Sequence, residues 1–251
     1  MTTFDDEITQ SFAPNRGTVE VRAWGAATST GHIRLENEDS WGHLARTRFA
    51  LADGMGGTKG GLLAAESSVQ GFLDVNPANG WVPELVALNR RVCRICQRAG
   101  FTNAGATLIG LEIERHRCVT VHIGDSRIYR LRQNILQLLT ADHNLRNLRI
   151  EEGLDPEMTD ERGTPRALTS WVGAPEEPDR IDVGTLSVQE GDRILLVSDG
   201  VSDQLTSMEI ESVLIEHSSP EVAAQVLVER SDNAGGKDNA TALVADLGVN
   251  D

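Results

Sequence analysis

The sequence contains no hydrophobic run of about 20 residues, the length that a membrane-spanning helix requires. Its first 17 residues are acidic and polar, and they lack the apolar stretch of a secretory signal. These absences argue against a membrane-spanning or secreted chain. We therefore expect a cytoplasmic protein with a flexible N-terminal segment at residues 1–17 and one folded domain at residues 18–251.

Positive charge is also scarce, because 23 Lys and Arg residues stand against 38 Asp and Glu residues, which gives a formal net charge of −15. Lys59 and Lys237 are the only lysines. Nucleic acids and anionic membranes are bound by positively charged surfaces, so neither is an expected partner. A basic ligand or a protein segment is easier to accommodate.

Cysteine is rare, with Cys93, Cys96 and Cys118 as the whole set. Cys93 and Cys96 have the C-x-x-C spacing of redox pairs and zinc sites, but no second pair of cysteines or histidines completes a site. The surrounding residues 81–99 have the apolar spacing of a helix. We interpret Cys93 and Cys96 as buried helix residues.

The rest of the chain reads as short strands with a few helices between them. Several strands follow one another through tight links, which predicts antiparallel hairpins. We therefore expect an α+β fold, a four-layer α-β-β-α sandwich of two antiparallel sheets flanked by helices. The predicted strands are residues 19–26, 48–53, 106–113, 118–125, 127–132, 135–140, 181–188, 193–199 and 240–247, and the predicted helices are residues 61–74, 81–99, 207–217 and 220–231.

Between residues 142 and 171 the strand pattern breaks down into a charged segment with Gly and Pro and one short helical stretch near residues 144–152. A loop-rich insert of this length in a compact domain is usually functional or mobile. We predict a flap here, and we call residues 142–171 the flap segment.

Four aspartates stand where hydrophobic strands end or begin: Asp53, Asp125, Asp199 and Asp238. If these strand ends meet, the carboxylates must bind protons or cations, because two of them about 4 Å apart repel by roughly 4 kcal/mol in a partly buried site. An oxygen-only ligand set without His or Cys is typical of Mg²⁺ or Mn²⁺ and argues against zinc or copper. The sequence therefore predicts a hard-metal site.

Seven segments in order together resemble one family, the metal-dependent protein serine/threonine phosphatases of the PP2C type (PPM family), especially the bacterial members. The resemblance covers almost the whole chain after residue 18. It implies the family's sandwich fold and hydrolysis of phosphoserine and phosphothreonine in proteins by a metal-activated water. The segments are RLENEDSW from Arg34, LADGMGG from Leu51, GATLIGLEI from Gly105, HIGDSRIY from His122, LTADHN from Leu139, LLVSDGVSD from Leu195 and GGKDNAT from Gly235.

The resemblance also implies a binuclear Mn²⁺ or Mg²⁺ centre. Asp53 would bridge both metals, Asp199 and Asp238 would hold one of them, and the carbonyl of Gly54 would help to hold the other. Asp125 would hold a third, more loosely bound metal.

Glu38 and Asp39 match the family's acidic pair, which acts on the metals directly or through water. Arg34 precedes that pair and is expected to bind phosphate, since a guanidinium suits bidentate contact with a phosphate. Asn239 is expected to donate a hydrogen bond near the metals, although an Asn before a strand is also a common turn residue.

The chain departs from the wider family at two places. Met55 stands where eukaryotic members carry a histidine proposed as general acid, so a leaving oxygen must take its proton from metal-bound water, on the third metal or elsewhere, or from solvent. The flap segment ends in TSWVGAPEE, which differs from the usual arginine-leucine-glycine ending, although Arg166 and Ala167 fit.

Three functions stay open on the sequence. The first is a phosphoprotein phosphatase, a monomer that opposes cytosolic Ser/Thr kinases. The second is a phospho-binding pseudophosphatase, which would be expected to lose metal acids or Arg34. The third is a phosphatase of small phosphorylated metabolites, which would use the same metals. His143 is interpreted as a structural residue of the flap, and His32, His116 and His122 as ordinary histidines without partners at ligand spacing.

Overall fold

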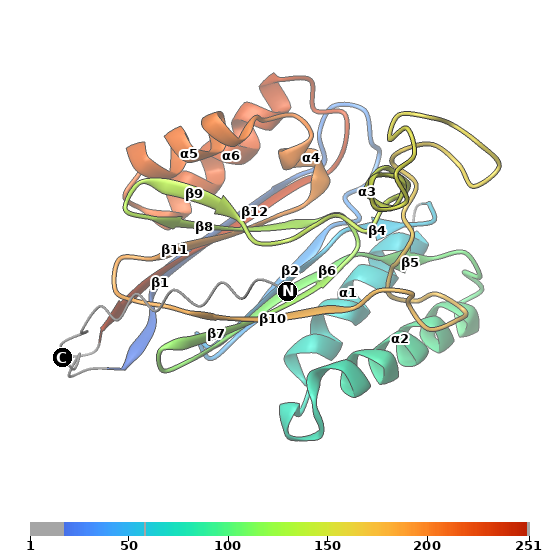
Figure 1. The fold of residues 1–251 in the computed structure, drawn as a ribbon, viewed down its shortest axis with the longest axis horizontal. Helices are drawn as coiled ribbons and strands as arrows, with labels where there is room; N and C mark the ends of the chain where they lie inside the picture. Colours follow the sequence, from blue (N-terminus) through green and yellow to red (C-terminus); the bar gives the residue numbers. More distant parts are fainter. Residues whose placement is uncertain (1–17, 58, 250–251) are drawn as a thin grey trace, which may run out of the picture.

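The structure, a computed structural model, describes residues 18–57 and 59–249. The predicted flexible segment 1–17 therefore lies outside the described residues. Two five-stranded sheets lie face to face, and helices cover their outer faces (Figure 1). Every strand pair is antiparallel. The α+β sandwich expected from the sequence is confirmed.

The first sheet has the order β1-β12-β11-β8-β9. Helices α5 (Ser207–Glu216) and α6 (Pro220–Asn233) pack on its outer face, where their buried aliphatic side chains join those of β11 and β12 in one cluster. The strands are β1 (Val19–Ser29), β8 (Arg127–Arg132), β9 (Ile135–Leu138), β11 (Arg193–Val197) and β12 (Ala240–Val249).

The second sheet has the order β10-β7-β6-β3-β2. Helices α1 (Lys59–Leu73) and α2 (Trp81–Arg98) cover its outer face, and the short helix η1 (Pro77–Asn79) connects them. The strands are β2 (Ser40–Leu44), β3 (Arg48–Ala52), β6 (Leu108–Glu114), β7 (Arg117–Ile123) and β10 (Asp182–Ser187).

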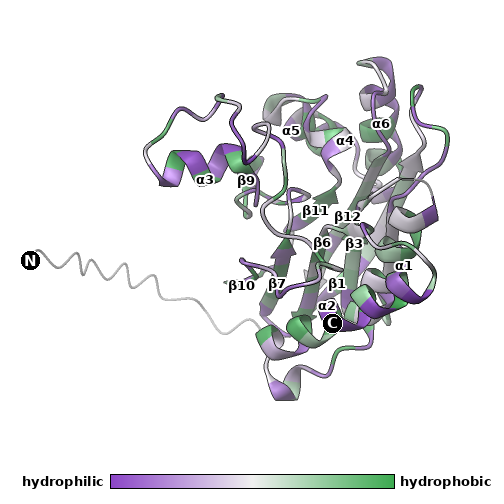
Figure 2. Ribbon diagram, turned by 90° about the vertical axis from the view of Figure 1, so that its right-hand side faces the viewer, coloured by the Kyte–Doolittle hydropathy of each residue, from purple (hydrophilic) through white to green (hydrophobic). Residues whose placement is uncertain are grey.

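A third hydrophobic cluster fills the space between the two sheets and includes Phe49, Leu51, Ile109, Ile194 and Leu243. Figure 2 shows this interior as hydrophobic strands between helices whose outer faces are more polar. Strands β3 and β11 are buried along their whole length, because side chains on both of their faces contact apolar layers. The apolar sequences that follow their first arginine, FALA in β3 and ILLV in β11, agree with this position.

The strand register places several strand ends at one end of the sandwich. In the second sheet Leu51 of β3 pairs with Ile109, and Leu108 pairs with Ile123 at the end of β7. In the first sheet Val197, the last residue of β11, pairs with Ala242 near the start of β12. The residues that follow β3, β7 and β11, and those that precede β12, therefore emerge at the same edge.

The predicted helices and strands are present, with boundaries that differ by a few residues. The sequence analysis did not predict β2, the short helix η1, the two-residue strands β4 (Gly54–Met55) and β5 (Gly105–Ala106), or the four-residue helix α4 (Asp199–Ser202). These elements are too short, or too polar and rich in glycine, to produce a periodic pattern.

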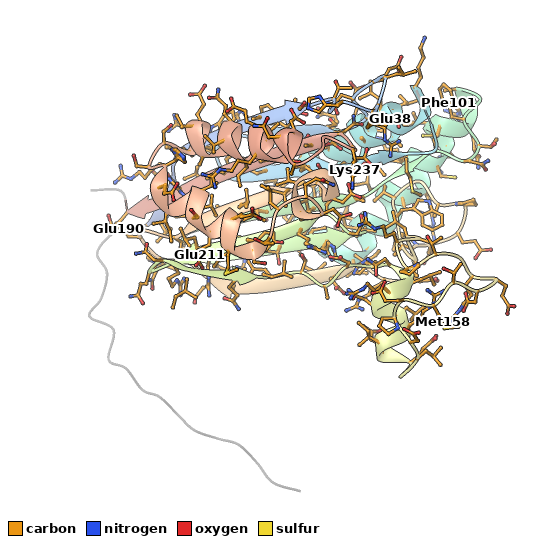
Figure 3. The ribbon with its side chains drawn as sticks, turned by 90° about the horizontal axis from the view of Figure 1, so that it is seen from above. Glu38, Phe101, Met158, Glu190, Glu211 and Lys237 are labelled. Carbon is orange, nitrogen blue, oxygen red and sulfur yellow. The ribbon has the colours of Figure 1, made fainter. Side chains whose placement is uncertain are left out.

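The flap segment lies between β9 and β10 and contains one helix, α3 (Leu145–Glu151), with turns after it. Figure 1 shows this segment beside β4 and β5, at the end of the sandwich where the aspartates emerge. In Figure 3, Met158 of the flap segment and Glu190 lie at opposite ends of the molecule. Among the described residues, no helix has both the length and the apolar character needed to cross a membrane.

Candidate metal centre

The four strand-end aspartates meet in a pocket of about 430 Å³. Of the predicted site residues, those that line it are Arg34, Glu38, Asp53, Gly54, Asp125, Asp199, Asp238 and Asn239. Figure 3 shows the loops of Glu38 and Lys237 close together, and the Glu38 backbone N–H donates to Asn239 Oδ1 over 2.9 Å. The segments that carry these residues are far apart in the sequence, and the two sheets bring them together.

Asp53 follows β3 directly, and its backbone N–H donates to Thr107 Oγ1 over 2.9 Å. Thr107 Oγ1 lies 2.7 Å from Ser126 Oγ, so one hydroxyl network joins the ends of β3 and β7. Burial raises the pKa of the Asp53 carboxyl well above its usual value, and repulsion from Asp39 and Asp199 raises it further.

Asp125 and Asp199 have raised pKa values for the same reasons. Burial and the charge of Asp199 raise the pKa of Asp125 to about 8. Burial and the charge of Asp238 raise the pKa of Asp199 to about 6. Without a cation, these carboxyls therefore retain protons that an exposed aspartate loses near pH 4.

Asp39 lies behind the pocket and does not line it. Its Oδ2 accepts hydrogen bonds from Ser198 Oγ (2.8 Å) and from Thr241 Oγ1 (2.6 Å), which ties the start of β2 to β11 and β12. Burial raises its pKa to about 7. Of the acidic pair expected to act on the metals directly or through water, only Glu38 therefore lines the pocket, and Asp39 faces Ser198 and Thr241.

Glu38 lines the pocket next to the point where the backbones of Gly54 and Gly61 approach each other closely. A side chain at Gly54 would place its Cβ 2.4 Å from Gly61 O and 2.7 Å from Glu38 O, well inside contact distance. Glycine at position 54 thus lets the backbone of β4 approach α1 and leaves its carbonyl beside the acids. Gly56 and Gly57 have φ values of 107° and 83°, which favour glycine and turn the chain after β4.

Asn239 holds the loop that carries Glu38. Its Oδ1 accepts from Glu38 N, and its Nδ2 donates to Thr30 O and Glu36 O, both over 3.0 Å. All its side-chain hydrogen bonds in the structure go to backbone atoms of residues 30–38. Arg34, on the same loop, is half exposed at the pocket rim and donates from Nη2 to Asp238 Oδ2 over 2.6 Å.

The residues present fit divalent cations. Glu38 Oε1, Asp39 Oδ1 and Asp199 Oδ1 are buried acceptor atoms that have no hydrogen-bond partner among the described residues. Among those residues, no histidine or cysteine lines the pocket, so every side-chain ligand would be an oxygen. Mg²⁺ and Mn²⁺ match this donor set, and a bound cation would offset the repulsion that raises the carboxyl pKa values.

A sequence model of the family described as protein phosphatase 2C matches residues 29–234. The chain belongs to the protein phosphatase 2C family. The family expected from the seven segments is therefore confirmed.

Two bacterial relatives are similar over most of this chain. The protein phosphatase PhpP of Streptococcus pneumoniae is 30% identical over 239 residues, which are 89% of this chain and 97% of PhpP. The serine/threonine protein phosphatase PstP of Mycobacterium tuberculosis is 34% identical over 245 residues, 90% of this chain and 45% of PstP. The crystal structure of the PstP catalytic domain, in complex with two manganese ions, has a TM-score of 0.77 at 29% identity and covers 92% of this chain and all of that domain.

Several residues of this protein phosphatase 2C site were not singled out in the sequence. Thr107, Ser126, Ser198 and Thr241 hold the acids in place, and all four lie inside the recognised segments. A Ser or Thr beside a strand end is common, so only the contacts distinguish these four. The flap segment contributes Arg166, Leu168 and Trp171 to the pocket wall.

The cysteines play no part in the pocket. Cys96 is buried in the cluster under α2, as interpreted from the sequence. Cys93 is only half-buried, so its interpretation as a buried residue was wrong, because α2 turns this position toward the helix edge. Cys118 is buried between the sheets.

Proposed function

We propose that this protein phosphatase 2C family member hydrolyses phosphoserine and phosphothreonine in proteins. The observation that carries the proposal is the convergence of Asp53, Asp125, Asp199 and Asp238 on one pocket with Arg34 at its rim. The names of PhpP and PstP, a protein phosphatase and a serine/threonine protein phosphatase, support the substrate class. Retention of the acids and of Arg34 speaks against a pseudophosphatase.

In this proposal Asp53 would help to hold both of two cations, Asp199 and Asp238 would help to hold one of them, and the carbonyl of Gly54 would help to hold the other. Glu38 and Asp39 would act on the cations through water. Mn²⁺ or Mg²⁺ is the proposed metal, and Asp125 is the candidate ligand of a third ion. When bound, two divalent cations lower the pKa of a water molecule between them and neutralise charge on the phosphoryl oxygens.

Arg34 is proposed to orient the phosphate. Its side chain is 51% exposed, so a phosphate arriving at the rim can accept from the guanidinium with little reorganisation of the fold. A dianionic phosphate and the Asp238 carboxylate both accept from the Arg34 guanidinium. Because the guanidinium has two Nη groups, one can bind the phosphate while the other keeps its bond to Asp238. This contact fixes the phosphorus over the acids without covalent attachment to the protein.

The leaving oxygen requires a proton that Met55 cannot supply, since a thioether carries none. Met55 lines the pocket, and among the described lining residues there is no histidine to replace it. Water is therefore the proposed proton source. Met55 instead presents an apolar surface to the pocket.

A second, larger pocket of about 950 Å³ adjoins the acids and shares Asp125 and Asp199 with the first. Arg146 and Arg166 of the flap segment line it. Its size suits a peptide that continues beyond the phosphorylated residue, which favours a protein substrate over a small metabolite. The cytoplasmic location, the monomeric state and the opposing kinase remain predictions.

The proposal is tested by Mn²⁺-dependent hydrolysis of p-nitrophenyl phosphate and of a phosphothreonine peptide. Asp53→Ala and Asp199→Asn are expected to lose at least a hundredfold in rate, because each removes a proposed metal ligand. Asp74→Ala and Asp74→Asn make the same chemical changes at an exposed aspartate at the end of α1, and they are expected to match the wild type.

Two results would contradict the proposal. Activity that persists unchanged in both site variants would remove the acids from the reaction. Hydrolysis of p-nitrophenyl phosphate without any peptide hydrolysis would instead favour the metabolite phosphatase.

A further inference from the structure

A second cluster of titratable side chains lies on the other side of the β7 turn that carries Asp125. His122 belongs to β7, His143 follows Asp142 at the start of the flap segment, and Asp182 begins β10. Antiparallel pairing sets Asp182 opposite His122, and the rings of His122 and His143 lie with their centroids 4.3 Å apart. The interpretation of His122 as a histidine without partners at ligand spacing was therefore wrong.

The donor atoms of these three residues lie within 4.8 Å of one another, which is close enough for a metal ion. The hydrogen bonds of His143 argue against one. Its Nδ1 accepts from the Gly124 backbone N–H over 3.2 Å, so in the neutral ring the proton is on Nε2. A metal at Nε2 would need that proton on Nδ1, pointing at the Gly124 N–H.

The same tautomer explains the contact with Asp182. His143 Nε2–H donates to Asp182 Oδ2 over 3.1 Å, and Arg180 Nε donates to both oxygens of Asp182 over 3.1 and 3.2 Å. The carboxylate therefore fixes which nitrogen of His143 carries the proton, as carboxylates that accept from a ring N–H do for other histidines.

Gly124 is held on both sides by His143. The His143 backbone N–H donates to Gly124 O over 2.7 Å, while Gly124 N–H donates to the ring. Gly124 has a φ of 110° and immediately precedes Asp125. On the other side of Asp125, Ser126 Oγ lies 2.7 Å from Thr107 Oγ1, so His143 holds the residue before Asp125 and the Thr107 hydroxyl holds the residue after it.

We propose that Asp182 and His143 are positioning residues that hold the Gly124 turn and thereby aim Asp125 into the catalytic pocket. Part of this inference rests on the proposed function, since Asp125 is the candidate ligand of the third ion. The arrangement runs from Arg180 through Asp182 and His143 to the turn. Arg180 Nη1 also donates to Glu151 Oε1 of α3 over 2.9 Å. We call this chain of hydrogen bonds, from Glu151 through Arg180, Asp182 and His143 to Gly124, the relay.

Burial keeps the His143 ring neutral near neutral pH, which is the protonation state that the relay requires. The His143 side chain is fully buried, and His122 covers one face of its ring. Burial and the neighbouring His122 lower the pKa of His143 to about 4, so its Nδ1 keeps the lone pair that accepts from Gly124.

The first test compares His143→Leu with His143→Asn, whose Oδ1 can replace Nδ1 as the acceptor. Hydrogen exchange of the Gly124 amide, measured by NMR on the full chain, is expected to be roughly fivefold faster in His143→Leu and close to wild type in His143→Asn. Mn²⁺ affinity at the weakest site, measured by calorimetry, is expected to fall roughly tenfold in His143→Leu only. His116→Leu, an exposed histidine before β7, is the matched control.

The second test reads the ring nitrogens of His143 by ¹⁵N NMR. The wild type is expected to carry its proton on Nε2, and Asp182→Leu is expected to reduce that preference. Asp182 is 39% exposed on an edge strand, so this variant tests the relay even if His143→Leu fails to fold.

Three outcomes would overturn the relay: a wild-type proton on Nδ1, unchanged Gly124 exchange in His143→Leu, or Zn²⁺ that binds and shifts both rings. The first two readouts need no enzyme activity. They therefore separate failure of the relay from failure of the proposed function.

Discussion

Arg34 Nη2 lies 2.6 Å from Asp238 Oδ2, although 204 residues separate the two in the sequence. The contact joins the proposed phosphate-binding arginine to a proposed metal ligand. Removal of Arg34 would therefore remove the proposed phosphate donor and also release the Asp238 carboxylate that the guanidinium orients.

Arg34→Ala is expected to lower kcat/KM for a phosphothreonine peptide about ten- to a hundredfold. A charge-assisted hydrogen bond contributes about 1.5–3 kcal/mol, and each 1.4 kcal/mol corresponds to a factor of ten. Arg34→Lys is expected to recover part of the loss, because lysine keeps the positive charge but not the paired donors of the guanidinium. Steady-state kinetics at saturating Mn²⁺ measure kcat/KM for each variant. Equal activity of Arg34→Ala and wild type would rule out the phosphate role.

Thr241 and Ser198 are expected to stabilise the fold through Asp39. Thr241→Val keeps the shape of the side chain but removes one of the two hydroxyl donors to the buried Asp39 Oδ2. Asp39 Oδ2 keeps its Ser198 donor, but a hydrogen bond to a charged group contributes about 1.5–3 kcal/mol, so urea unfolding should show a loss of about this size. Thr185→Val on the exposed part of β10 makes the same change and should stay within about 0.5 kcal/mol of wild type.

The sequence allowed the prediction of the strand-end aspartates because each one lies close to an apolar run, and such runs become buried strands. It did not separate Glu38 from Asp39, since adjacent residues in extended backbone point to opposite sides. Glu38 faces the pocket and Asp39 faces Ser198 and Thr241. Only the fold shows which acid takes which side.

The His122–Asp182 pairing was equally inaccessible from the sequence. It depends on the register of β7 with β10, two strands with the whole of β8, β9 and the flap segment between them. Local pattern predicts that strands exist, but register is set by the long-range fit of two faces. The flap segment contacts were missed for the same reason, because turns without periodicity leave no signal in the sequence.

Cysteine reactivity should follow burial and pKa. Burial raises the pKa of Cys118 to about 12, so even at pH 10 only about 1% of this thiol is the reactive thiolate. Burial also raises the pKa of Cys96. Iodoacetamide at pH 8.5 is expected to modify Cys93 alone in the native protein and all three cysteines after denaturation. Mass spectrometry of the intact chain counts the adducts, and native labelling of Cys118 at pH 8.5 would contradict its burial.

Arg149 is expected to organise the flap segment. Its side chain is fully buried, and it donates from Nη1 to Met158 O and from Nη2 to Asp160 Oδ1 (2.8 Å) and Gly163 O (2.9 Å). One side chain thus closes the turn from residue 149 to residue 163. Arg149→Ala removes all three hydrogen bonds, and although Asp160 Oδ1 keeps its bond from the Arg162 N–H, the link between α3 and residues 158–163 is lost.

Because those bonds lie within the flap segment, the cost of Arg149→Ala should appear there as local opening while the sandwich stays folded. Hydrogen exchange across residues 152–165 is expected to accelerate, and KM for the phosphopeptide is expected to rise more than KM for p-nitrophenyl phosphate, which needs no flap contact. Arg91→Ala, at an exposed position of α2, is the matched control, since Arg91 lies outside the flap segment. A parallel rise of both KM values would show that the flap segment acts on the acids and not on the peptide.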